Sequence, residues 1–202
     1  MTRLQSIARI VQGDAASAHH LPQKGLMPPK RVIMIRSQPR FLRFRVMNVW
    51  VDADACPVVI KDMLFRAARR THVLVTLVAN QALLIPASPY IKALRVAITP
   101  DAADQAILDR AAHNDLVVTA DIPLAAHAVR LGAMGLSPRG VVFNQDTIGA
   151  HVATRNLMTD LRDTGAITGG PATLSLADRQ NFANQLDAWL ARLPALKALK
   201  VE

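Results

Sequence analysis

Short apolar runs alternate with amphipathic stretches along most of the chain, from residue 48 onward. Residues 49–52, 72–79 and 116–119 are short and rich in β-branched residues or leucine, which is typical of buried strands. The same pattern predicts strands at 94–99 and 140–143, and helices at 57–70, 101–113, 123–132, 147–164 and 175–193. Apolar strands that alternate with helices favour a mostly parallel sheet covered on both faces. We therefore expect an α/β fold, a three-layer α/β/α domain with a central sheet of about five strands.

Local signals set the expected helix ends. Pro57 and Pro123 suit first helical turns, and Gly132 and Pro194 are expected to end helices. Two helices are expected to begin with a capping box, Asp101 with Asp104 and Ser175 with Asp178. Residues 81–93 hold two prolines and room for one helical turn, and residues 169–171 (Gly-Gly-Pro) should break the chain.

The positive charge is concentrated at the start of the chain. Of the net +9, residues 1–46 contribute +8, from nine Lys or Arg and one Asp, and residues 47–202 contribute only +1. We expect residues 1–46 to be a flexible extension that the fold does not need. It reads as a basic disordered arm, a transit peptide, or upstream sequence translated from a start codon assigned too early. The α/β domain is expected at 47–193, with a tail at 194–202.

Membrane and disulfide classes find no support in the sequence. The longest stretch without charge, residues 71–91, is interrupted by polar residues and prolines, well short of the roughly 20 apolar residues that span a bilayer. Residues 1–46 contain no apolar core of a secretory signal, and Cys56 is the only cysteine. We expect a cytoplasmic protein with no membrane partner.

Acidic residues follow several of the expected strands. Asp52 and Asp54 end the first strand, Asp121 follows the fourth, and Asp104 belongs to the helix after the third. Because parallel strands present their carboxyl ends at one edge, these four carboxylates should converge there. Hard oxygen ligands of this kind suit Mg²⁺ or Mn²⁺, which can activate water for phosphoryl chemistry. The four aspartates are therefore the candidate metal ligands and catalytic residues.

Each of these acids also has a structural interpretation. Asp54 and Asp121 could cap the helices that follow them, and Asp104 could belong only to a capping box. Asp52 is the hardest to explain in this way, because a charge beside a buried apolar run is costly unless it is paired or coordinated.

Other residues carry weaker signals. Asn80, Thr119 and Arg139 are the expected substrate contacts, although no spacing requires it. Cys56 could be activated by a helix N-terminus, but a small buried residue is the plainer interpretation. The histidines show no zinc-ligand spacing, and dinucleotide and P-loop motifs are absent from the sequence.

Several motifs in order resemble the YaiI/YqxD family of uncharacterised bacterial proteins: VDADACP (51–57), VANQ (78–81), TADIPLA (119–125), Arg139-Gly140, TGGP (168–171) and LADRQNFA (176–183). The resemblance covers about 47–193, and residues 1–46 depart from it. It implies a PIN-like domain, a fold of metal-dependent ribonucleases. By analogy, Asp52, Asp54, Asp104 and Asp121 would then form a Mg²⁺ site for phosphodiester cleavage.

Three functions remain open from the sequence. The first is a Mg²⁺- or Mn²⁺-dependent nuclease whose partner is RNA or single-stranded nucleic acid, bound by a local patch of arginines (Arg66, Arg69, Arg70, Arg139, Arg155). The second is a haloacid-dehalogenase-like phosphatase that uses Asp52 and Asp54, for which Lys92 is the only lysine between Lys61 and Lys197. The third is a non-catalytic binding module.

Overall fold

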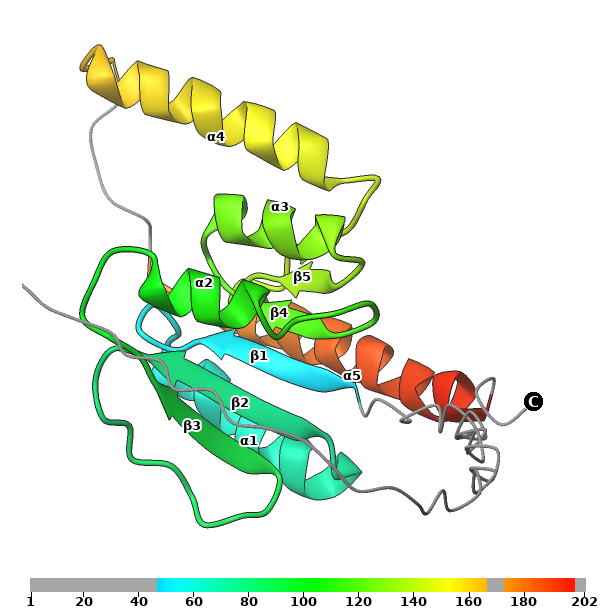
Figure 1. Cartoon of the computed structure of the whole chain (residues 1–202). Helices are drawn as coiled ribbons and strands as arrows, with labels where there is room; N and C mark the ends of the chain where they lie inside the picture. The colour runs from blue at the N-terminus through cyan, green and yellow to red at the C-terminus, as the bar shows by residue number, and fades with distance from the viewer. Residues whose placement is uncertain (1–46, 167–172, 199–202) are drawn as a thin grey trace, which may run out of the picture. The chain divides into compact units, whose positions relative to one another are not determined.

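The protein forms an α/β domain in which a single sheet carries helices on both faces (Figure 1). The structure, a computed structural model, describes residues 47–166 and 173–198. The expected extension at 1–46 and the break at 169–171 lie outside these residues. In chain order the elements are β1 (Asn48–Asp52), α1 (Val58–Thr71), β2 (Leu74–Ala79), β3 (Ile91–Arg95), α2 (Ala102–Leu108), β4 (Leu116–Val118), α3 (Ile122–Arg130), β5 (Met134–Leu136), β6 (Val142–Phe143), α4 (Ile148–Asp163) and α5 (Leu176–Ala198).

The sheet has the strand order β3-β2-β1-β4-β5-β6. The first five strands of this order are parallel, and β6 pairs antiparallel with β5. The predicted three-layer architecture is confirmed. Strand β5 was not predicted, because its three residues include Gly135 and follow a helix too closely to show a separate apolar run.

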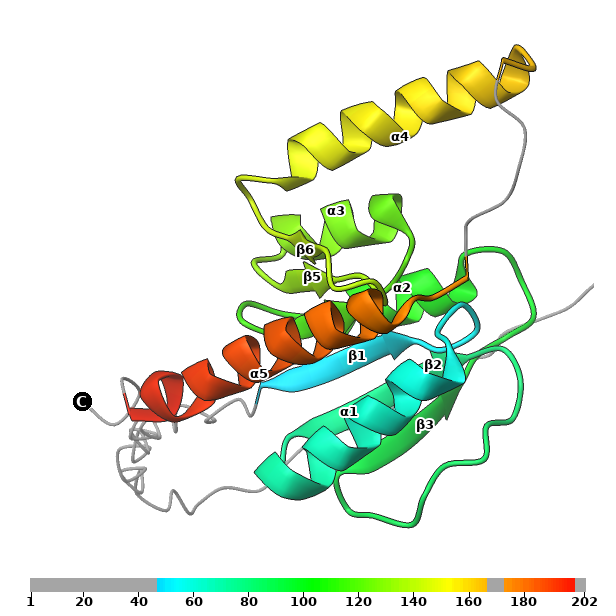
Figure 2. The same ribbon diagram turned by 180° about the vertical axis from the view of Figure 1, so that it is seen from behind.

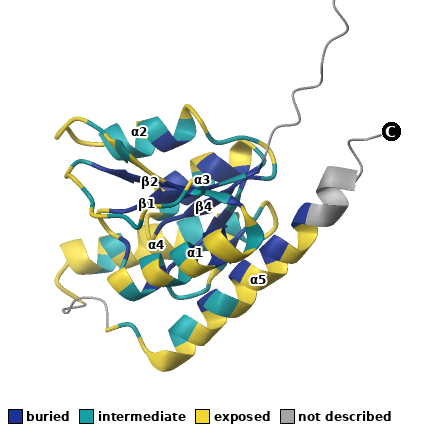
Figure 3. Cartoon of the chain, turned by 90° about the horizontal axis from the view of Figure 1, so that it is seen from below, coloured by how far each residue is buried: buried dark blue, intermediate teal, exposed yellow. Residues whose placement is uncertain are grey.

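Alternation along β1 divides the core between the two faces. Val49 and Val51 pack into the cluster that contains the apolar residues of α1 and α5, whereas Trp50 packs with residues of α2 and α3. Figures 1 and 2 show these helix pairs on opposite sides of the sheet. The buried positions of α5 recur at helical spacing along one side of the helix (Figure 3): Phe182, Leu186, Trp189, Leu190 and Leu193.

Helix α4 lies outside the three layers. It runs alongside α3 on the side away from the sheet (Figures 1 and 2), where Ile148 joins a small cluster with Ala125, Val129 and Phe143. None of its 16 residues is buried. Its docking therefore rests on few apolar contacts.

Two expected boundaries around the third strand are wrong. The strand is Ile91–Arg95 and not 94–99, because Ile91 already pairs with Val75 of β2. The helix that follows ends at Leu108 and not near His113. The backbone turns where the amides of Arg110 and Ala111 both donate to the carbonyl of Ile107. No helical turn forms within 81–93.

Of the two ends predicted for the last helix, the first is confirmed and the second is wrong. The capping box is confirmed, since the Ser175 amide donates to Asp178 Oδ2 (2.8 Å) and the Asp178 amide donates to Ser175 Oγ (3.0 Å). The expected helix end at Pro194 is wrong, because α5 continues to Ala198. A proline removes its own amide donor without forcing every helix to stop. None of the helices that the structure describes is long and apolar enough to cross a membrane.

Candidate active site at the carboxyl edge of the sheet

The parallel strands bring the predicted acidic residues to one edge of the sheet. Asp52 is the last residue of β1, and Asp121 stands between β4 and α3. Because β1 and β4 are paired neighbours, their carboxyl ends are adjacent. Asp54 follows β1, and Asp104 lies in the first turn of α2. We call the four carboxylates of Asp52, Asp54, Asp104 and Asp121 the acidic edge.

Asp52 is the most buried member of the acidic edge, with 9% of its surface exposed. The hydroxyl of Thr119 donates to its Oδ2 at 3.0 Å. Burial raises the pKa of Asp52 above its usual range, the Thr119 hydrogen bond opposes this, and the charges of Asp54 and Asp121 raise it further. This carboxylate is therefore desolvated and repelled by its neighbours.

Thr119 connects the two central acids. Its hydroxyl donates to Asp52 and accepts from the backbone amide of Asp121 at 2.9 Å. Asp121 also caps α3, because its Oδ1 accepts from the Leu124 amide at 2.8 Å. Capping uses one carboxylate oxygen, so Oδ2 of Asp121 can still reach a ligand. The capping role that the sequence left open for Asp121 is thus confirmed without excluding a second role.

Asn80 holds Asp54 through its backbone. The Asn80 amide donates to Asp54 Oδ2 at 2.9 Å, which ties the loop after β1 to the end of β2. The alternative that Asp54 caps α1 is wrong, since Pro57 occupies the N-cap and no side chain caps that helix. Substrate contacts by Asn80 and Thr119 remain predictions; the contacts observed for both position carboxylates.

The pKa of Asp104 is raised by burial and by the other acids around it. Partial burial raises its pKa to about 6, and the charges of Asp121, Asp52 and Asp101 add to the effect. The predicted capping box with Asp101 is wrong: Asp101 has a left-handed backbone (φ 57°) and its side chain makes no capping hydrogen bond. Asp104 is therefore not fixed by the helix end, and its carboxylate belongs to the acidic edge electrostatically.

The raised pKa of Asp104 predicts a pH-dependent stability. The folded protein holds the proton more tightly than the unfolded chain, so this group favours folding below its ordinary value of 3.8 and loses that advantage as pH rises through about 6. In chelator, the melting temperature of the wild type should fall between pH 4 and 7 relative to that of Asp104→Asn. Thermal melts across this range measure the difference. The exposed Asp160→Asn is the control, and parallel curves for wild type and Asp104→Asn would contradict the expectation.

The acidic edge fits a hard divalent cation by its donor chemistry. All of its side-chain donors are carboxylate oxygens, the ligands that Mg²⁺ and Mn²⁺ prefer. Within the described residues, no three acidic, histidine or cysteine side chains are arranged as a ready-made metal cage. Mg²⁺ commonly binds through one or two carboxylates together with water and substrate phosphate, so Asp52 and Asp121 are the pair that suits it.

Cys56 is next to this edge but is not an activated nucleophile. It is buried, with 6% exposed, and burial raises the pKa of its thiol to about 12. Lys61 opposes the shift and Asp52 adds to it. The interpretation of Cys56 as a small buried residue is confirmed.

Arg139 lies near the same edge, in the turn between β5 and β6. Its guanidinium donates to Asp178 of α5 at 2.8 Å. The following residue, Gly140, has φ 79°, and a side chain there would meet the backbone of Asn181 and Phe182 at 2.6 Å. The Arg139-Gly140 motif therefore fixes this turn against α5, and its guanidinium is already engaged by an acid.

The sequence interpretation missed Asp115, which precedes β4 at the opposite edge. It is fully buried, accepts from the Asn48 amide and from the Trp50 indole, both at 3.0 Å, and accepts from the Ala112 amide at 3.1 Å. The signal that could have found it is the one used for Asp52, an acid directly beside a buried apolar run. Asp115 anchors the start of β1 to β4.

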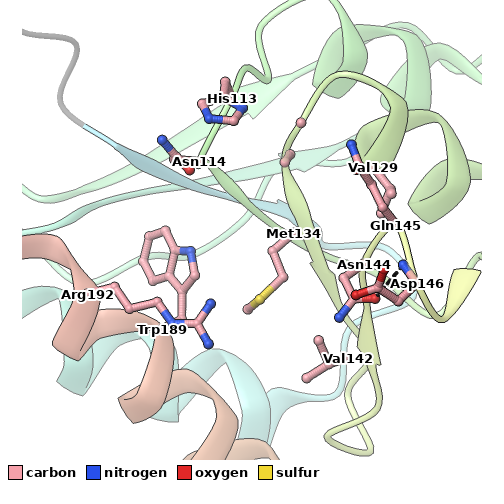
Figure 4. Close-up of a pocket in the computed structure, with 12 residues that line it drawn as sticks. His113, Asn114, Val129, Met134, Val142, Asn144, Gln145, Asp146, Trp189 and Arg192 are labelled. Atoms are coloured by element: carbon pink, nitrogen blue, oxygen red, sulfur yellow. Dashed lines mark hydrogen bonds between the residues drawn. The ribbon is translucent and has the colours of Figure 1, made fainter. Parts of the chain in front are cut away.

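A cleft opens at the edge of the sheet where the parallel strands begin, which we call the amino edge (Figure 4). It has a volume of about 390 Å³, and its polar lining combines His113, Asn114, Asn144, Gln145, Asp146 and Arg192. These residues precede β4, follow β6 or come from α5, so the cleft lies at the end of the sheet opposite the acidic edge. It contains none of the predicted site residues.

A family model and individual relatives match the same part of this chain. A sequence-family model described as "Uncharacterized BCR, YaiI/YqxD family" matches residues 50–192. A UPF0178 protein of Shewanella amazonensis is 54% identical over 148 residues, which cover 73% of this chain and 99% of that protein. UPF0178 proteins of Proteus mirabilis (54% identical; 71% of this chain, 95% of theirs) and Xanthomonas oryzae pv. oryzae (53%; 73% and 91%) are similar to the same extent. No solved structure gives a significant match. The chain belongs to the YaiI/YqxD family.

Proposed function

We propose that this protein is a Mg²⁺- or Mn²⁺-dependent nuclease of PIN-like type that hydrolyses phosphodiester bonds in RNA, in the cytoplasm. The observation that carries the proposal is the convergence of negative charge at the acidic edge, where Asp52 and Asp121 both raise the pKa of Asp104. Carboxylates that repel one another at the carboxyl ends of parallel strands are unfavourable for folding unless a cation joins them. That cost is the expected signature of a functional site.

The residues of the acidic edge have distinct parts in this proposal. Asp52 and Asp121 are the main ligands, and Asp54 and Asp104 act directly or through water. Thr119 keeps one oxygen of Asp52 engaged and so orients the other. The bound ion would supply an activated water and would stabilise the charge that develops at the phosphorus. Burial and the charges of its acidic neighbours raise the pKa of Asp104 to about 6 in the metal-free protein, and a cation bound among these carboxylates would favour its ionised, ligating form.

A haloacid-dehalogenase-like phosphatase finds less support in the geometry. That chemistry needs a lysine beside the nucleophilic aspartate. Lys92 is exposed on the edge strand β3, two strands away from β1. It lies opposite Thr76, in the middle of β2, and not at the carboxyl end of the sheet where Asp52 lies. Asp52 is also held by a hydroxyl and surrounded by other acids, which suits a cation better than a phosphoryl acceptor.

The proposal is tested by an activity screen of the full chain. Labelled RNA, labelled single-stranded DNA and p-nitrophenyl phosphate are incubated with Mg²⁺, with Mn²⁺ or with chelator. Cleavage of RNA that requires the metal is the expected result. Release of p-nitrophenol without cleavage of either polymer would favour the phosphatase, and no reaction with any substrate would favour a binding module.

A further inference from the structure

A cleft between α3 and α4 has a lining that carries only positive charge. Its volume is about 210 Å³. Helix α3 contributes residues at helical spacing, and α4 faces them with three more: Pro123, Ala126, His127 and Arg130, then Val152, Arg155 and Asn156. We call this the α3–α4 cleft.

Three other clefts formed by described residues each contain an acid beside their arginines. Asp62 lines the cleft with Arg66 and Arg69, and Asp187 lines the one with Arg66 and Arg70. In the larger cleft at the amino edge, Asp146 accompanies Arg192. The α3–α4 cleft has two arginines, one histidine and no acid in its lining.

Ion pairs engage some of the arginines but not those of the α3–α4 cleft. Arg70 pairs with Asp187, and Arg139 pairs with Asp178, so two members of the patch expected from the sequence already have acidic partners. Arg130 and Arg155 are exposed, and neither has an acidic partner among the residues that the structure describes. The contact made by Arg155 is a long hydrogen bond of 3.5 Å to the amide oxygen of Asn156. Both guanidinium groups are therefore available to an anion.

The cleft begins at the acidic edge. Pro123, at one end of its lining, follows Asp121 by two residues at the N-terminus of α3. Arg130 lies seven residues further on, about 10 Å along the helix axis at 1.5 Å per residue. A chain of phosphates that follows α3 would thus pass from the arginines to the carboxylates.

We propose that the α3–α4 cleft binds the backbone phosphates of a single-stranded nucleic acid, through Arg130, Arg155 and His127, and leads the strand to the acidic edge. The inference deepens the proposed function and rests on it. Arginine presents several N–H donors in a planar fork that matches phosphate oxygens. No aromatic side chain other than His127 lines the cleft, so recognition addresses the backbone and should tolerate many sequences.

The test compares two double variants that remove the same charge from different places. Arg130→Gln/Arg155→Gln empties the cleft of its arginines, and Arg66→Gln/Arg69→Gln removes two exposed arginines from α1. The full chain is used, because both variants then retain the same basic residues 1–46. Binding of a fluorescein-labelled oligouridylate is measured by fluorescence anisotropy in chelator, where no hydrolysis occurs, at several salt concentrations.

The cleft variant should bind about tenfold more weakly than the wild type, and the α1 variant nearly as tightly as the wild type. The slope of log K against log salt is negative, and loss of two phosphate contacts should reduce its magnitude by about 1.4, at about 0.7 per contact for single strands. Equal weakening of both variants, or weakening of the α1 variant alone, would overturn the inference. So would equally tight, arginine-dependent binding of a labelled oligoglutamate, which would make the cleft a general polyanion site.

Hydrolysis is measured separately, so that the two proposals fail in different ways. Loss of RNA binding in the cleft variant, with no metal-dependent cleavage by the wild type, would retain the cleft and reject the nuclease. Cleavage at wild-type rates by the cleft variant, at RNA concentrations far below saturation, would retain the nuclease and reject the cleft.

Discussion

Asp121→Asn is expected to abolish Mn²⁺ binding and to reduce RNA hydrolysis by about 100-fold or more, because it removes one of the two main carboxylate ligands. The fold should survive the change. Asparagine caps a helix about as well as aspartate, and the amide oxygen can still accept from the Leu124 amide that Asp121 Oδ1 binds. Calorimetric titration with Mn²⁺ and a cleavage assay measure the two effects, and circular dichroism verifies the helix content.

Asp178→Asn is the matched control. Asp178 also caps a helix and also lies near the carboxyl edge, where it accepts from the Ser175 amide and pairs with Arg139. The hydrogen bonds from Ser175 are the main reason why the pKa of Asp178 is lowered. This carboxylate therefore already has hydrogen-bond partners within the protein. The control should bind Mn²⁺ like the wild type. Unchanged Mn²⁺ affinity in Asp121→Asn would show that the acidic edge is wrongly assigned.

The acidic edge was predictable because strand direction alone brings its residues together. Once β1 and β4 are parallel neighbours, residues that follow them must meet, whatever the side chains do. Burial of Asp52 followed from the apolar residues before it, and the capping role of Asp121 from its place ahead of Ile122-Pro123. These inferences need only the order of elements and the chemistry of one residue at a time.

The arginines that can bind an anion were harder to predict, because residues far away in the sequence decide whether an arginine is already paired with an acid. Arg70 and Asp187 are 117 positions apart, and Arg139 and Asp178 are 39 apart. Arg130 was not singled out from the sequence, because it shares a cleft with Arg155 only once α3 and α4 pack together, and the two residues are 25 positions apart in the chain. The expected patch therefore combined arginines from different elements of the fold, and two of them, Arg70 and Arg139, are paired with acids.

The sequence patterns that predicted the two ends of α2 were also wrong. Asp101 has the sequence of a helix cap, but its left-handed backbone leaves its side chain outside the helix end. The end of α2 comes earlier than its apolar pattern suggests, because the backbone turns where the amides of Arg110 and Ala111 both donate to the carbonyl of Ile107. Beyond this turn, Asp115 accepts from the Asn48 amide and the Trp50 indole and so anchors the start of β4 to β1.

The largest expected effect on stability belongs to this anchor. Asp115→Asn keeps the shape of the side chain but replaces one acceptor oxygen with an NH₂ group. Whichever way the amide is turned, at least one of the three N–H groups from Asn48, Trp50 and Ala112 then faces a donor inside the protein. An unpaired buried donor costs about 1–3 kcal/mol, so we expect a loss of about 1–3 kcal/mol and a fall in melting temperature of roughly 5 °C or more.

Denaturant unfolding of the wild type, Asp115→Asn and the exposed Asp62→Asn measures this effect. The Asp62 variant should stay within about 0.5 kcal/mol of the wild type, as surface changes usually do. Asp115 precedes Thr119 by four residues, about 13 Å along an extended strand, so the folded fraction of Asp115→Asn should bind Mn²⁺ with wild-type affinity. A stable Asp115→Asn protein that has lost Mn²⁺ binding would contradict the assignment, because it would make Asp115 part of the metal site and leave the start of β1 without its anchor.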